Sequence, residues 1–96
     1  MSVYAMIQLT IHDRARYDAY TNAFMPVLEQ YGGKLLVAQD NPQVMEGEWT
    51  GDRVVLLEFA DKKAFVTWAT SPEYTAIAED RRAGSNAVVL LARGVE

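Results

Sequence analysis

The stretch that most constrains this chain is residues 53–74, an apolar run followed directly by helix signals. Residues 54–59 are mainly β-branched and aliphatic, which is typical of a strand buried on both faces. Because side chains alternate along a strand, the odd-numbered residues of this run should share one face and the even-numbered residues the other. The even face carries Glu58, the one charge that interrupts the run.

Two helices are predicted after this strand. Asp61 stands where a helix N-cap belongs, and Phe65, Trp68 and Ala69 follow at helical spacing. Residues 71–73, Ser-Pro-Glu, end that helix and start another, because serine caps well, proline is tolerated at the first position and glutamate favours the positive end of the helix dipole. The inward face of the second helix is expected to hold Tyr74, Ile77, Ala78 and Arg81, and Gly84 ends it.

The rest of the chain supplies further strands and one long helix. Residues 3–11 alternate between a fully apolar face and a mixed face that includes Gln8. Residues 14–31 predict a helix in which Pro26 should cause a kink or a restart. Further strands are predicted at 34–39 and 86–93, with a short one at 44–49.

The resulting order, βαββαβ, matches a ferredoxin-like α+β fold with an antiparallel sheet. Residues 1–96 should form a single domain. Right-handed crossovers would put the first and third main strands in the centre and both helical parts on one face.

The sheet has too much apolar surface for helices on one face alone. Val54 and Leu56 oppose Val55 and Leu57 on the central strand, and the last strand shows the same pattern. A single copy would expose a large apolar patch, which usually marks an interface. We therefore expect a two-fold homodimer with the sheets packed face to face.

Composition excludes several classes of partner. The formal net charge of −4 argues against nucleic acid and anionic membranes, because both require a basic patch. The chain has no cysteine, so it has no disulfide framework and no thiolate chemistry. No apolar run approaches the roughly 20 residues that span a bilayer, and a cytoplasmic location is expected.

Several motifs resemble those of domain-of-unknown-function family 1330 along almost the whole chain. These are Tyr17 with Tyr20, Tyr31-Gly32-Gly33-Lys34, Glu46-Gly47, Leu57-Glu58-Phe59, Ser71-Pro72-Glu73-Tyr74 and Arg81-Arg82. The resemblance implies a ferredoxin-like member of the dimeric α/β-barrel superfamily, which includes cofactor-free monooxygenases, dehalogenases, isomerases and haem-binding proteins. It implies no particular activity, because fold kinship does not fix function.

Glu58 is the candidate catalytic residue. Its alternation puts it on the face away from the helices, where a carboxylate inside a dimer would need a partner. It is a candidate general base or ligand anchor. The alternatives are a structural ion pair with Lys34 or an arginine, or a position at the strand end that reaches water.

Candidate substrate-binding residues are of two kinds. Lys34 and Arg81 can bind a carboxylate, although surface charge or pairing with acidic residues is the preferred explanation; Gln8 can point at a ligand or bond a partner subunit. Aromatic side chains at helical spacing can line a pocket or simply form core. These are Tyr17, Tyr20, Trp68 and Tyr74, of which Tyr74 needs a partner for its hydroxyl if buried.

His12, the only histidine, is expected to be exposed at a strand-to-helix corner, and it has no cluster of ligands around it. No metal site and no cofactor are predicted. The sequence thus favours a small homodimeric protein that binds a small, partly apolar organic acid or phenol. It is either a cofactor-independent enzyme using Glu58 with Arg81 or Lys34, or a non-catalytic binding module or purely structural dimer.

Overall fold

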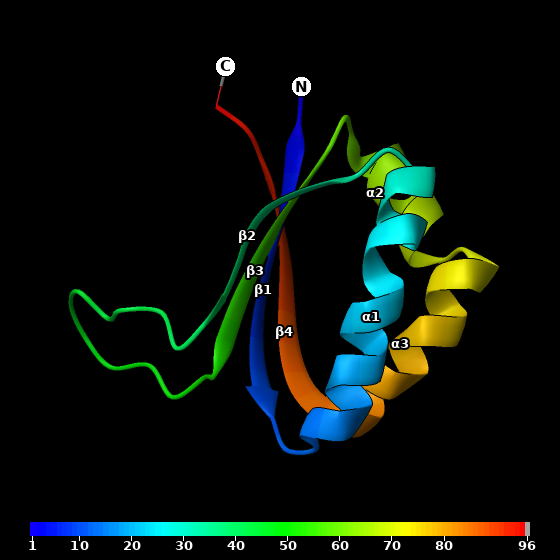
Figure 1. Cartoon of the computed structure of the whole chain (residues 1–96). Coiled ribbons are helices and arrows are strands. Elements are labelled where there is room, and N and C mark those ends of the chain that lie inside the picture. The colour runs from blue at the N-terminus through cyan, green and yellow to red at the C-terminus, as the bar shows by residue number, and fades with distance from the viewer. Residues whose placement is uncertain (96) are drawn as a thin grey trace.

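The computed structural model describes residues 1–95 and shows a four-stranded antiparallel sheet with helices on one face (Figure 1). The elements in chain order are β1 (Val3–Ile11), α1 (Arg14–Gln30), β2 (Lys34–Asp40), β3 (Arg53–Phe59), α2 (Lys62–Ala69), α3 (Pro72–Gly84) and β4 (Ser85–Arg93). The strand order is β2-β3-β1-β4, so β3 and β1 are central. The predicted ferredoxin-like βαββαβ fold is confirmed.

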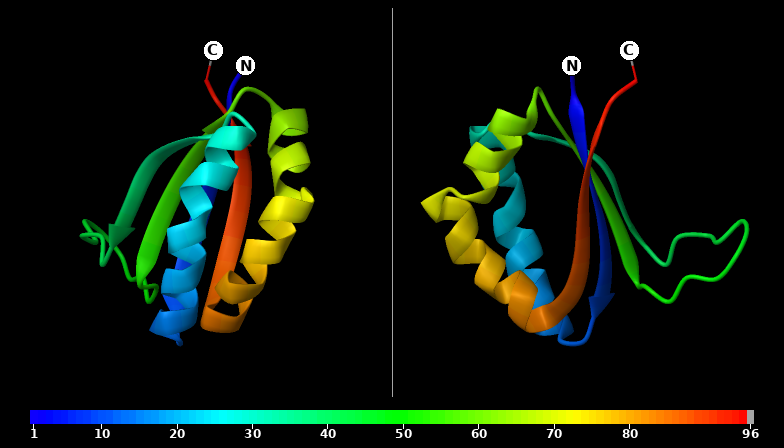
Figure 2. Two further views of the ribbon diagram at one scale, coloured as in Figure 1. Left: turned by 45° about the vertical axis from the view of Figure 1, so that its right-hand side comes forward. Right: turned by 180° about the vertical axis from the view of Figure 1, so that it is seen from behind.

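Strand alternation decides which side chains form the core. The odd-numbered residues of β1 and β3 point toward the helices, and most are buried, whereas the even-numbered residues are partly or fully exposed. The buried set is Val3, Ala5, Ile7, Leu9, Val55, Leu57 and Phe59. Helices cover one face of the sheet and leave the other, here called the open face, uncovered (Figure 2). The open face therefore carries the even-numbered side chains of both central strands.

The helices begin where the sequence places their caps. The side-chain oxygens of Asp13, Asp61 and Ser71 each accept a hydrogen bond from the backbone N–H three residues later, at 3.2, 2.8 and 3.0 Å. Each bond satisfies a donor that the first turn of a helix leaves without a partner. These local bonds fix the positions at which α1, α2 and α3 begin.

One expectation about local structure is wrong, and another is resolved in part. Helix α1 is continuous through Pro26, so the proline causes no restart; Phe24 and Leu28 on either side of it are both buried in the core. Residues 44–49 form no strand. They belong to a long connection between β2 and β3 that projects away from the helices (Figure 1), and Gly47 turns the chain there with φ +84°.

A β-bulge in β2 changes which of its side chains face the helices. Leu35 pairs with Leu57, but Val37 pairs with Leu56, so one extra residue is inserted between them. The bulge moves Ala38 onto the same face as Leu35 and sets Asp40 opposite Arg53. Bulges commonly redirect side chains next to functional sites.

Within residues 1–95, no helix combines the length and apolar character needed to cross a bilayer.

The end of α3 packs tightly against the start of α1. The Gly84 carbonyl accepts bonds from the backbone N–H groups of His12 at 2.9 Å and Asp13 at 3.1 Å. A Cβ atom at Gly84 would lie 2.8 Å from both the Asp13 carbonyl oxygen and the Tyr17 nitrogen. Because both neighbours are backbone atoms, the helices must separate to admit it.

We predict that Gly84→Ala lowers the free energy of unfolding by about 1–3 kcal/mol, the usual cost of overpacking. The control is Ala83→Ser, which adds an atom at the adjacent exposed position and should change stability by less than about 0.5 kcal/mol. Urea denaturation at equal protein concentrations measures both. Equal midpoints for the two variants would show that the contact is not tight.

Candidate functional site

A cavity of about 80 Å³ lies between α1 and the helix-covered face of the sheet. Its walls are mainly apolar, and α1, β3 and α3 contribute a few polar side chains. The apolar residues are Ile7, Leu9, Phe24, Met25, Leu35, Ala38 and Val55, and the polar ones are Tyr17, Tyr20, Thr21, Arg53 and Arg81. An apolar pocket with a few converging polar groups is the usual form of a small-molecule site.

Local structure explains how two arginines reach this cavity. Arg53 is the first residue of β3 and shares the helix-side face with Val55, because both positions are odd-numbered. Arg81 lies two turns after Tyr74 on α3, so it points to the same side as that buried tyrosine. The sheet and the helix layer therefore each contribute one guanidinium.

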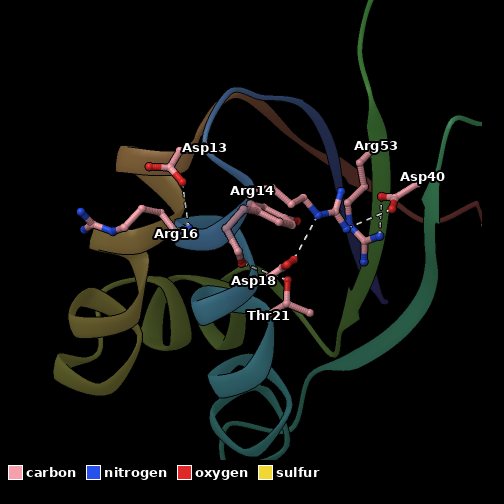
Figure 3. Close-up of polar contacts among 8 residues, drawn as sticks. Asp13, Arg14, Arg16, Asp18, Thr21, Asp40 and Arg53 are labelled. Carbon is pink, nitrogen blue, oxygen red and sulfur yellow. Dashed lines mark hydrogen bonds and ion pairs between the residues drawn. The ribbon is translucent and has the colours of Figure 1, made fainter.

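Arg53, which lines the cavity, is held by a cluster of charged side chains (Figure 3). The two carboxylate oxygens of Asp40 accept from Arg53 Nη1 at 2.9 Å and from Arg14 Nη2 at 3.1 Å. Arg14 also donates to Asp18 through Nε at 3.1 Å. The hydrogen bond from Arg53, followed by that from Arg14, holds the pKa of Asp40 below its ordinary value, so Asp40 is ionised at neutral pH.

The charge of Arg81, by contrast, is not compensated by a carboxylate in the described part of the chain. Within residues 1–95 its guanidinium takes part in no ion pair, and its buried Nε has no hydrogen-bond partner. The buried Nε of Arg53 also lacks a partner among these residues, although the Nη1 of that side chain bonds Asp40. A buried donor without a partner is costly, so an acceptor that reached either N–H group would gain a hydrogen bond there.

Tyrosine hydroxyls border the same cavity. Tyr20 and Tyr74 share a hydrogen bond of 3.0 Å between their hydroxyl oxygens. Burial raises the pKa of Tyr20 far above its ordinary value, with Tyr74 adding to the rise and the charge of Arg81 opposing it. Burial also raises the pKa of Tyr17, against the opposing effect of Arg53. Both phenols are therefore neutral, and the Tyr20 hydroxyl can donate to a ligand when Tyr74 is the donor of their shared hydrogen bond.

The residues predicted from the sequence fall into three groups. Arg81 and Tyr17 line the cavity. Trp68 and Tyr74 are core residues, 2% and 6% exposed, whose rings pack with a centroid separation of 4.0 Å. Gln8, Lys34 and Glu58 lie on the open face, because they are even-numbered residues and the odd-numbered residues beside them point toward the helices.

Glu58 and Arg81 do not form one site within a subunit. They lie on opposite faces of the sheet, so the mechanism that combines them is not supported by this geometry. Glu58 is partly exposed and faces Lys34 on β2 and Tyr4 on β1 in the strand register. No ion pair joins it to Lys34 or any other of residues 1–95. Gln8 accepts a bond from Trp49 Nε1 at 3.2 Å, which ties the long connection to the open face.

Sequence reasoning missed Arg53 and Asp40 as site residues. The signal for Arg53 was present, since its odd position in the strand places it with Val55 on the helix side. Asp40 could not be placed in this way, because the bulge in β2 changes the alternation before it. His12 is exposed, as predicted, and among residues 1–95 no three His, Asp or Glu side chains are grouped to hold a metal.

The model of a domain of unknown function, DUF1330, matches residues 2–95. No curated protein matches.

Solved structures with this fold include three that cover nearly all of the chain. A protein of unknown function from Rhodopseudomonas palustris has a TM-score of 0.85 and 18% identity, over 99% of this chain and 83% of that one. A dimeric ferredoxin-like protein from Jannaschia has a TM-score of 0.76 and 16% identity, over 98% and 100%. SnoaB, a cofactor-independent oxygenase from Streptomyces nogalater, has a TM-score of 0.72 and 15% identity, over 99% and 94%. At these identities the similarity establishes the fold alone.

We predict that Tyr74→Phe destabilises the protein by about 1–3 kcal/mol, because it removes one of two buried hydroxyls that bond each other. In the double variant Tyr20→Phe/Tyr74→Phe neither hydroxyl is left alone, so the loss should be smaller than the sum of the two single losses. Thermal or urea unfolding of the four proteins gives this coupling. Strict additivity would show that the hydroxyl contact contributes nothing.

Proposed function

We propose that this chain, which belongs to the DUF1330 family, binds a small, partly apolar organic anion in the cavity between α1 and the sheet. The observation that carries the proposal is that Arg81 lines an apolar cavity while its buried Nε has no partner within residues 1–95. A guanidinium that donates to an anion forms a charge-assisted bond, stronger than a neutral one.

The size and lining of the cavity limit the ligand. A volume of about 80 Å³ exceeds the roughly 10–15 Å³ needed by one water but is well below the roughly 300 Å³ of a drug-sized site. The apolar wall from Phe24, Met25 and Val55 favours a hydrocarbon or aromatic body. Met25 adds adaptability, because an unbranched thioether side chain changes shape easily.

A second copy of the chain is the proposed partner of the open face. Val88 and Leu90 on β4 are 55% and 50% exposed, beside Met6 at 38% on β1. The projecting connection carries Val44 and Met45, which are 47% and 83% exposed. Both the open face and the connection between β2 and β3 thus expose apolar side chains. A second copy that covers the open face and contacts this connection would bury them.

Dimerisation would also change the surroundings of Glu58. A second sheet across the open face would enclose Glu58, Lys34 and Gln8, and in that setting Glu58 stays the candidate general base. The dimeric state of the Jannaschia protein supports the pairing. The cofactor-independent chemistry of SnoaB supports catalysis as the second candidate function.

We predict that Arg81→Gln weakens binding of pentanoate, a seven-atom monocarboxylate probe, by about tenfold or more, the scale of a lost charge-assisted hydrogen bond. Arg82→Gln is the matched control, because Arg82 is the next residue of α3 and is exposed. It should leave the affinity unchanged. Isothermal titration calorimetry measures all three proteins, and equal losses in the two variants would contradict the proposed site.

We predict that the chain sediments as a dimer at micromolar concentration and that Leu90→Glu converts it to a monomer, since a charge would be buried in an apolar interface. Thr67→Glu, at an exposed position of α2, is the control and should remain dimeric. Sedimentation velocity distinguishes the species. A monomeric wild-type protein would refute the pairing of open faces and would leave the cavity proposal unaffected.

A further inference from the structure

We infer that the cavity selects organic monoanions over dianions, because its two arginines offer only one uncompensated positive charge. This inference rests on the proposed function and deepens it by fixing the charge of the ligand. It also assigns Asp40 a role in specificity, although Asp40 is not a wall residue of the cavity.

The charge count follows from the ion pairs around the cavity. Arg14, Asp18, Asp40 and Arg53 form one connected cluster of two cations and two anions (Figure 3), so its formal charge is zero. Arg81 joins no ion pair among residues 1–95. A ligand with one negative charge therefore neutralises the site, whereas a second negative charge would meet no uncompensated arginine in the cavity wall, because Arg53 already pairs with Asp40.

The two arginines differ in what they can offer. Arg53 already donates Nη1 to Asp40, which compensates its charge, and its buried Nε has no partner in the described part of the chain, so this N–H can orient a ligand oxygen. Arg81 offers a buried Nε without any carboxylate partner in the described part of the chain. The neutral hydroxyls of Tyr17 and Tyr20 add donors but no charge. Arg81 is thus the position for the acid group of the ligand.

Asp40 acts at a distance by holding Arg53. Its Oδ1 lies 2.9 Å from Arg53 Nη1, and the side-chain exposure is 16% for Arg53 against 40% for Asp40. The charge of the mostly buried Arg53 is thus compensated by the more exposed Asp40. Asp40 can therefore be substituted without disturbing the packing of the core. Removing the charge of Asp40 would free Arg53 and give the cavity a second uncompensated cation.

The test compares three probes of matched skeleton, pentanoate, its neutral amide pentanamide, and the dianion glutarate, with calorimetry at neutral pH. Wild-type protein should bind pentanoate about tenfold or more tightly than either of the others. In Asp40→Asn the ratio between pentanoate and glutarate should fall to about one or reverse. The control is Asp18→Asn, which removes the same charge from the same cluster but pairs with Arg14 only; its ratio should equal that of wild type.

The outcomes separate this inference from the proposed function. If pentanoate binds through Arg81 but glutarate binds equally well to wild type, the charge rule fails and the anion site stands. An unchanged ratio in Asp40→Asn, or an equal change in Asp18→Asn, also overturns the rule. If pentanoate does not bind, or pentanamide binds equally well, both the rule and the proposed anion site fail.

Discussion

The two-residue repeat of β3 determines how the whole domain is arranged. Its odd-numbered side chains must all point to the side that α1, α2 and α3 cover, because adjacent residues of a strand alternate. Three of these residues form the centre of the core. The fourth, Arg53, follows them to the same side, so a charge is placed at the edge of a hydrophobic layer. The cavity lies where this layer meets α1.

This constraint also explains why the two faces of the sheet differ in chemistry. The helix-covered face combines buried aromatic and aliphatic residues with two guanidinium groups and neutral phenols. The open face carries Glu58, Lys34 and Gln8 among partly exposed apolar side chains. A ligand anchored by Arg81 therefore cannot reach the carboxylate of Glu58 in the same subunit, and the two faces must serve different purposes.

Much of this arrangement could be predicted from local signals. Alternation in 3–11 and 54–59 gives the strands and the inward residues, and the caps at Asp13, Asp61 and Ser71 give the helix starts, because each depends on neighbours in sequence. The same signals place Arg81 beside the core. They do not reveal its missing partner, since an absent ion pair depends on residues distant in the chain.

The remaining errors have physical causes of the same kind. The continuity of α1 through Pro26 comes from tertiary packing, which offsets the local cost of proline. The bulge in β2 comes from pairing with β3, and it brings Asp40 to Arg53. Glu58 is predicted as a catalytic residue because it is the one charge in an apolar run. In the structure this position lies on the open face of the sheet and not beside the cavity.

The proposed function depends on the guanidinium of Arg81 binding an anion inside an apolar cavity. Nuclear magnetic resonance of the arginine Nε–H groups tests it most directly, because each such group gives its own signal. During titration with pentanoate, the Arg81 signal should move progressively and saturate. The signal of Arg16, whose Nε already donates to Asp80 at 2.8 Å on the surface, should stay in place. A stationary Arg81 signal, or equal shifts of the two, would contradict the account.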